Sequence, residues 1–288
     1  MGSLIAEQVF NGVMMASVYA LIATGLVLIF GVMRVFNFAH GEFVMVGAYV
    51  TTFVFAATRN YFLAILAAMA ALAVMGVIAE RAVFRRLRSL HGQVIAASGL
   101  LLFFQNLAVL LWGPHALRTP VPYRTMIVNV LGFTVSVQRL LVVGISLVIM
   151  LLLFLFLHKT RLGTAIRATA QSQDAAYVVG IDVDRVHVVV FAISAALAGL
   201  AGALIGPLFL TYPTMGSLPL LKGLAAVIVG GMDSIVGAIL ASLLIGITES
   251  ISTMFISSGF KDAVAFFMLV VVLVVRPRGI FGSAVRGE

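Results

Sequence analysis

Long uninterrupted apolar runs constrain the fold of this 288-residue chain more than any other feature. An α-helix rises 1.5 Å per residue and the hydrocarbon core of a bilayer is about 30 Å thick, so roughly 20 residues cross it. The runs lack the strict alternation of a membrane β-strand. We therefore predict an all-α, polytopic membrane helical bundle. The runs cover residues 5–32, 40–58, 62–80, 93–113, 138–158, 187–210, 219–232, 234–256 and 260–276.

The run 219–232 is shorter than the others. Its 14 residues would extend about 21 Å as a helix, so it is either a half-span or a broken helix. We therefore expect eight or nine spans in a single transmembrane domain over residues 1–288. The first run lacks a basic leading segment and is too long for a cleaved signal peptide, so we expect it to be a span.

Composition supports a membrane protein and excludes several other classes. Hydrophobic residues make up 62% of the chain and charged residues only 10%, which leaves too little polar surface for a water-soluble domain. The chain has no Cys, which excludes disulfides and thiolate metal sites. The net charge of +8 would suggest nucleic acid in a soluble protein, but here the basic residues occupy short gaps between apolar runs. We therefore expect no nucleic-acid partner.

The distribution of basic residues predicts the orientation. The connections 81–91 and 159–186, the tail and Arg34 hold 12 of the 18 Lys and Arg residues. Positively charged connections stay in the cytoplasm, so these segments and the C-terminus are predicted to be cytoplasmic. Nine crossings then place the N-terminus outside, whereas a re-entrant 219–232 would reverse that side. The basic residues of the tail are Arg276, Arg278 and Arg286.

Motifs for nucleotide or metal chemistry are missing from the sequence. It contains neither G-x-x-x-x-G-K-[ST], which cradles ATP phosphates, nor H-E-x-x-H, and its five His residues are scattered. We expect no catalytic residue, no metal site and no cofactor on this chain. The connection 114–137 is predicted to be an external loop, either an ordered connector or a docking or lid surface.

Two stretches are similar to each other. Gly41 and Gly231 each precede a Val-Gly-Ala triplet by several residues and have an acidic residue close behind them. Broken helices at corresponding places in two halves of a transporter indicate its pathway, because the freed backbone groups must be buried or line a wet cavity. We therefore predict helix breaks at Gly41, Gly230 and Gly231.

Polar residues at membrane depth are candidate pathway groups. Asn37, His40 and Glu42 lie between two runs almost without a spacer, and such groups should face the bundle interior. Two interpretations stay open: these residues cap the break between helices, or with Gly41 they line a permeation path.

A second candidate group lies near the C-terminal end of the chain. Glu249 falls inside an apolar run and needs a partner, for which Lys222 is a candidate. The pair is either a brace between helices or part of a substrate or proton site. Gln105 and Asn106 are expected to form interhelical hydrogen bonds, and Gly199, Gly202 and Gly206 to allow close helix packing.

The segment 160–182 is polar and rich in Ala, unlike the rest of the chain. It is predicted to form one short amphipathic cytoplasmic helix that ends at a Gly C-cap, Gly180. Its small residues suit insertion into a groove on a partner, although an ordinary surface helix would show the same pattern.

Several stretches together resemble a known family, the permease subunits of ABC importers for branched-chain amino acids, specifically the shorter of their two permeases. They occur in family order and cover nearly the whole chain. The matching stretches are Phe10-Asn11-Gly12 with Tyr19 to Gly25, Asn37 to Glu42 with Gly47-Ala48-Tyr49, Arg167-Ala168 through Asp174-Ala175-Ala176 to Gly180-Ile181, Lys222 with Gly230-Gly231, and Phe260-Lys261-Asp262 through Arg276 to Gly282.

The resemblance implies a multi-pass protein of the inner (cytoplasmic) membrane that is not itself an enzyme. Its implied partners are the lipid bilayer, a second homologous permease, two cytoplasmic ATPase subunits and an external substrate-binding protein. The family's ATPase-coupling helix corresponds here to the segment that contains Arg167, Asp174, Ala175, Ala176, Gly180 and Ile181. Relatives are also assigned to urea, short amides or aromatic acids, so the substrate stays open.

Three other functions stay open on the residues alone. A proton-coupled secondary transporter would work through Glu249 or Glu42 without ATP. A channel would conduct passively. An intramembrane enzyme would need a nucleophile and base or a metal constellation, and the sequence offers neither.

Overall fold

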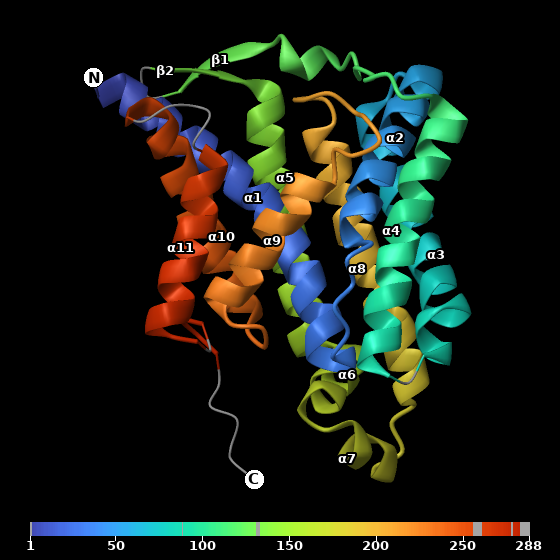
Figure 1. Ribbon diagram of the computed structural model, residues 1–288. Helices are drawn as coiled ribbons and strands as arrows, with labels where there is room; N and C mark the ends of the chain where they lie inside the picture. Colours follow the sequence, from blue (N-terminus) through green and yellow to red (C-terminus); the bar gives the residue numbers. More distant parts are fainter. Residues whose placement is uncertain (1, 88, 131–132, 256–260, 278, 283–288) are drawn as a thin grey trace.

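A helical bundle with one small β-hairpin emerges from the computed structural model, which describes residues 2–87, 89–130, 133–255, 261–277 and 279–282 (Figure 1). Arg88, Phe260, Arg278 and Arg286 of the sequence predictions lie outside the described residues. The helices are α1 (Gly2–Met33), α2 (His40–Thr58), α3 (Tyr61–Ala82), α4 (Leu90–Trp112), α5 (Val137–Lys159), α6 (Arg161–Gln171), α7 (Gln173–Val178), α8 (Val183–Ile205), α9 (Ser217–Gly230), α10 (Ile235–Phe255) and α11 (Lys261–Val275).

The helices match the predicted apolar runs closely, and the all-α membrane bundle is confirmed. Seven helices are long and apolar enough to cross a bilayer, and α9 and α11 are shorter apolar helices. The count of eight or nine spans stays a prediction. The predicted end of the helix in the run 187–210 was wrong, because α8 already stops at Ile205. Pro207 follows two residues later and has no backbone N–H to continue the helix.

The loop 114–137 is more ordered than the sequence indicated. It contains a 3₁₀ turn (Pro122–Arg124) and an antiparallel hairpin of β1 (Ile127–Val130) and β2 (Phe133–Ser136), which pairs Ile127 with Ser136. The hairpin and the start of α1 lie at one end of the bundle, and α6 and α7 at the other (Figure 1). We refer to these as the hairpin end and the α7 end.

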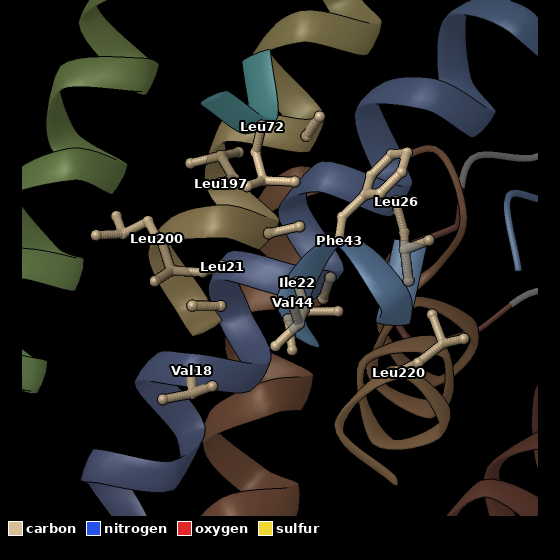
Figure 2. Packing of buried hydrophobic residues seen from close by; sticks show 14 of the residues in the cluster. Val18, Leu21, Ile22, Leu26, Phe43, Val44, Leu72, Leu197, Leu200 and Leu220 are labelled. Atoms are coloured by element: carbon tan, nitrogen blue, oxygen red, sulfur yellow. The ribbon is translucent and has the colours of Figure 1, made fainter. Parts of the chain in front are cut away.

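The core forms where α1, α2, α3, α8 and α9 meet. Within the most apolar window of each helix, 83% of residues are buried in α1 but only 11% in α4, so α1 is central and α4 peripheral. Side chains from the five central helices interdigitate in Figure 2. They include Val18, Leu21, Ile22 and Leu26 of α1, Phe43 and Val44 of α2, Leu72 of α3, Leu197 and Leu200 of α8, and Leu220 of α9.

Glycines allow the central helices to touch backbone to backbone. A Cβ added to Gly47 of α2 would lie 2.6 Å from Cα of Gly199 of α8, and one added to Gly202 would collide with the carbonyl of Val44. The predicted role of Gly199 and Gly202 in close packing is thereby confirmed. The bundle contacts are set by van der Waals packing of small residues, as is usual within a membrane.

The observed interruptions of the helices differ in detail from the helix breaks that the sequence predicted. The first interruption covers residues 34–39, so Gly41 is the second residue of α2 and not the break itself. α9 ends at Gly230, and Gly231 has a φ of +105°, a conformation that favours glycine. The C-terminal segment satisfies the carbonyls at this helix end, because the amides of Ile280 and Phe281 donate to Val229 and Gly230 (2.8 and 3.1 Å).

We predict that Gly47→Ala destabilises the protein by about 1–3 kcal/mol, because the new methyl would meet the backbone of Gly199, which has no side chain to move aside. Thermal unfolding of the purified protein in detergent measures the effect. Gly144→Ala on α5 is the matched control, because a Cβ there meets nothing within 4 Å. Equal unfolding temperatures for the two variants would contradict the packing argument.

Candidate functional site

The start of α9 lies within the bundle beside the start of α2. A Cβ added to Gly41 would lie 2.7 Å from the carbonyl oxygen of Gly216, the residue before α9. Gly41 therefore permits close approach of two helix starts that are about 175 residues apart in sequence. The connection 206–216, which leads into α9, is joined to the 114–137 connection by an isolated bridge between Thr211 and Leu117.

Lys222, on the second turn of α9, is the centre of a buried charged cluster. Its Nζ donates to Oε1 of Glu249 on α10 at 2.6 Å and forms an ion pair with Oδ1 of Asp262 on α11, also at 2.6 Å. The hydroxyl of Tyr19 on α1 donates to Oε2 of Glu249 at 3.0 Å. Four helices therefore meet through one ammonium, two carboxylates and one phenol.

Burial differs between the two carboxylates. The side chain of Glu249 is 8% exposed and that of Lys222 5%, whereas 34% of Asp262 is exposed. A buried ion is tolerated only when it is paired and its hydrogen-bonding capacity is used, as it is for Glu249. Asp262 is thus the member of the cluster most accessible from the space above it.

That space is a cavity of about 670 Å³ at the hairpin end. Its floor carries Lys222, Glu249, Asp262 and Tyr19, and two arginines of the 114–137 connection, Arg118 and Arg124, also line it. Most of the remaining lining is apolar and comes from α1, the 206–216 connection and α9. These residues are Met15, Ile205, Leu208, Phe209, Leu210, Tyr212, Met215, Leu218 and Pro219.

The other predicted pathway residues form a separate group around the start of α2. Oδ1 of Asn37 accepts from the backbone amide of Ala39 at 3.1 Å, a local turn before α2, while the N-cap of α2 is Ala39 and has no side-chain cap hydrogen bond. The imidazole of His40 is buried against Gly25 and contacts the backbone of Ile22. Glu42 is fully buried and accepts from Gln105 of α4 at 2.9 Å.

The structure therefore divides the six predicted pathway residues into two groups. Gly41, through Gly216, is the contact between them, and α1 touches both, through Tyr19 for the cluster and Ile22 for His40. Apolar side chains such as Ile22, Phe43 and Leu220 fill the region near these helix starts (Figure 2).

Sequence reasoning missed Tyr19 and Asp262 as members of the cluster. Both residues belong to stretches that carried the family resemblance, but neither has a neighbour in sequence that indicates its role. Arg118 and Arg124 belong to the connection 114–137, for which the sequence predicted only an external loop. Their position over the cluster depends on how that loop folds, and no sequence motif indicates this fold.

The polar segment at the α7 end forms two helices, so the prediction of a single helix was wrong. Ser172 has an extended backbone between α6 and α7, and its hydroxyl caps α7 by accepting from the amide of Ala175 at 3.2 Å. A serine favours such capping over a helix interior. Gly180 follows α7 with a φ of +81°, as expected for a C-terminal glycine.

The predicted coupling residues lie on α6 and α7 and in the two positions 180 and 181 that follow α7. Arg167, Asp174, Ala175 and Gly180 are exposed, Ile181 is half-buried and Ala176 is buried, with its carbonyl accepting from Ile181 at 2.9 Å. Three apolar side chains of the segment are also exposed and were not predicted. Tyr177, Val178 and Val179 are 56%, 87% and 73% exposed.

We predict that Lys222→Met costs about 3–5 kcal/mol of stability, because it leaves Glu249 and Asp262 without their shared cation. Glu249→Gln should cost less, since Lys222 keeps Asp262. Thermal unfolding in detergent compares the variants. The control is Arg34→Met, which removes an exposed ion pair with Asp233 (3.7 Å) and should cost less than about 1 kcal/mol. A Lys222→Met effect no larger than this control would refute the role of the cluster.

Comparisons with known proteins agree over nearly the whole chain. A family model described as "Branched-chain amino acid transport system / permease component" matches residues 8–273. The chain is 33% identical to the high-affinity branched-chain amino acid transport system permease protein LivH of Escherichia coli (strain K12) over 96% of its length and 95% of that protein. It is equally similar to the corresponding permease protein BraD of Pseudomonas aeruginosa, with the same coverage.

A solved structure supports the fold. PsaBC from Streptococcus pneumoniae in complex with Fab superposes with a TM-score of 0.53 over 93% of this chain and 91% of that one. The sequence identity is 14%, so the likeness concerns the fold alone.

Proposed function

This chain belongs to the family of permease components of branched-chain amino acid transport systems, and from that premise we propose that it forms part of the substrate pathway of an ATP-driven importer. The proposed substrate is an amino acid with a branched or otherwise apolar side chain. The observation that carries the proposal is the 670 Å³ cavity, which combines an apolar wall with charges of both signs.

The charges of the cavity are complementary to a zwitterion. Two carboxylates share one ammonium on the floor, so the cluster has one negative charge in excess and favours an amino group. Arg118 and Arg124, together with the N-terminal end of α9, provide positive charge for a carboxylate. Met15, Leu208 and Phe209 offer an apolar surface for the side chain. Urea and short amides lack the charges that this arrangement would bind.

The hairpin end is proposed to face outward, where an external binding protein delivers the substrate. The basic connections between helices then lie in the cytoplasm together with α6 and α7, as the positive-inside rule requires. This orientation opens the cavity toward the delivery side in an inner membrane.

The exposed apolar tip of α7 is proposed to insert into a groove on an ATPase subunit. Tyr177, Val178 and Val179 project into solvent, and apolar side chains gathered at such a tip indicate a protein contact. A second homologous permease and two ATPases complete the proposed importer, and ATP binds only to the ATPases.

Hydrogen bonds of α1 connect α7 to the charged cluster that forms the floor of the cavity. The side-chain Nε2 of Gln173, at the start of α7, donates to the carbonyl of Val32 near the end of α1 at 2.7 Å. Tyr19 of the same helix donates to Glu249 in the cluster. In the proposed alternating-access cycle, closure of the ATPases shifts α7 and α1, and the different contacts of the cluster in the two states change access to the cavity.

A proton-coupled transporter that works through Glu249 is disfavoured by the geometry of that acid. Both oxygens of Glu249 are engaged, by Lys222 and Tyr19, so this carboxylate is neutralised by a neighbouring cation instead of by a proton. Accumulation by the chain alone in liposomes, driven by a pH gradient without ATP, would favour that alternative.

We predict that Asp262→Asn slows ATP-dependent leucine uptake about tenfold or more, since a charge-assisted hydrogen bond is worth about 1.5–3 kcal/mol. The complete importer in liposomes, supplied with radiolabelled leucine, provides the measurement. Asp233→Asn is the control, because that acid lies at the opposite end of the bundle and is 38% exposed. Uptake by Asp262→Asn at the rate of the control would contradict the role of the cluster in the pathway.

We predict that Val178→Glu abolishes uptake and reduces substrate-stimulated ATP hydrolysis to its basal rate, because it puts a charge on the apolar tip. The side chain is 87% exposed, so the thermal stability of the purified chain should not change. Val178→Leu, which keeps the tip apolar, is the matched control. Stimulation unaffected by the charge would exclude this tip as the ATPase contact.

A further inference from the structure

A second cavity lies beside the one that was assigned to the substrate. It has a volume of about 290 Å³ and lies at the hairpin end, where the hairpin leads into α5 (Figure 1). Small-molecule sites begin at about 300 Å³, so this space is of the size that a small ligand needs. Arg124, Leu208 and Phe209 line both cavities, so the two spaces are neighbours. We call the second one the hairpin cavity.

The hairpin cavity carries positive charge and no negative charge among its described lining residues. Arg124 and Arg139 line it, and none of the other described residues that line it is acidic. The larger cavity differs, because Glu249 and Asp262 belong to its floor. A cleft lined by charges of one sign concentrates ions of the opposite sign. The hairpin cavity therefore favours an anionic group, whereas the larger cavity also accepts a cationic one.

Arg139, in the first turn of α5, is fixed in place but not neutralised. Its Nη1 donates to Oδ1 of Asn11 on α1 at 2.7 Å, and the guanidinium forms no ion pair with a described acid. Its Nε and Nη2 donate to no other described residue. These two nitrogens form the edge of a guanidinium that binds a carboxylate through two parallel hydrogen bonds. Arg139 is thus oriented for an anion that the chain itself does not provide.

Arg124 is the charged residue that the two cavities share. It ends the 3₁₀ turn and is half-buried, and its guanidinium has no hydrogen bond or ion pair with another described residue. Ser136 adds a hydroxyl to the hairpin cavity, and this hydroxyl has no partner in the part of the chain that the structure describes, although Ser136 is the N-cap of α5. A carboxylate in the hairpin cavity therefore has donors on two sides, one of which also faces the larger cavity.

The remaining lining suits an apolar side chain. Met14 of α1 and Val135 of β2 are only 5% and 2% exposed, and Ile127 of β1 lies beside them in the lining. Guanidinium groups, hydroxyls and an apolar wall without an acid match a carboxylate that carries an apolar chain. A lipid phosphate also binds arginine, but the continuity with the larger cavity favours a small ligand that passes from one space to the other.

We propose that the hairpin cavity is a first binding subsite, which holds the carboxylate of the incoming amino acid before its ammonium reaches the charged cluster. Arg139 and Arg124 bind the carboxylate there. As the substrate moves inward, Arg139 releases it and Arg124 retains it, while the ammonium approaches Asp262. The carboxylate is then never left without a partner during the transfer, which avoids the cost of an unpaired charge. The inference rests on the proposed function, because it takes the larger cavity as the substrate pathway.

Photolabelling locates the ligand without any change to the chain. The probe is L-photo-leucine, an amino acid with a diazirine in its apolar side chain, added to the complete importer with and without ATP. We expect mass spectrometry to find label on Ile127 or Val135 in the hairpin cavity and on Tyr212 or Met215 in the larger one. Excess leucine should prevent both. Excess leucinamide, which has the ammonium but no carboxylate, should leave the label of the hairpin cavity undiminished.

Substitution of Arg139 tests the role of its charge. We expect Arg139→Gln to reduce the label in the hairpin cavity about tenfold or more, since it removes a charge-assisted hydrogen bond, and to leave the label in the larger cavity within about twofold. Arg59→Gln is the matched control, because this exposed arginine between α2 and α3 lines neither cavity. Thermal unfolding shows whether Arg139→Gln is folded, and the competition by leucinamide decides the question if it is not.

Three results would overturn the subsite. They are label in the larger cavity alone, as expected if a lipid phosphate fills the hairpin cavity, competition by leucinamide equal to that by leucine, and label in the hairpin cavity that Arg139→Gln does not reduce. In each of these cases the proposed function stands, because the larger cavity is still labelled. If neither cavity is labelled in an importer that accumulates leucine, the proposed pathway and the subsite both fail.

Discussion

The ion pairs of Lys222 with Glu249 and Asp262 are the interaction on which this half of the bundle depends. They join α9, α10 and α11, and the hydroxyl of Tyr19 adds α1. Without water to solvate them, these charges must remain together, so the relative positions of four helices are fixed by one cation. The same cluster is the floor of the largest polar cavity described here, so stability and the proposed pathway share the same residues.

Two short interruptions of helical structure make that arrangement possible. α9 has only 14 residues and starts within the bundle, next to the start of α2, where Gly41 and Gly216 leave room for backbone contact. Leu218 and Pro219, among the first residues of α9, line the cavity. At the other end of α9 the carbonyls of Val229 and Gly230 accept from the amides of Ile280 and Phe281, so the break leaves neither of these two carbonyls unpaired.

The peripheral helices have a different role from the central ones. α1 and α8 are buried by tight packing of apolar and small residues, which gives a rigid scaffold. α4 and α5 present apolar faces outward, and α7 presents an apolar tip beyond the bundle. A permease component is one part of a larger assembly, and these unpartnered surfaces are where the proposed neighbouring subunits have room to bind.

The sequence by itself determined the fold class, the positions of nearly all helices and the family, because apolar run length is a local property and the family motifs are spread over the chain. It also indicated Lys222 as the partner of Glu249. Only the tertiary structure decided that Asp262 and Tyr19 complete that cluster, that Gly41 is a contact and not a break, and that Ser172 divides the polar segment into two helices. These features depend on which helices become neighbours. The cluster residues that pair with Glu249 are 27 and 230 positions away from it in sequence, so they meet only when the bundle packs.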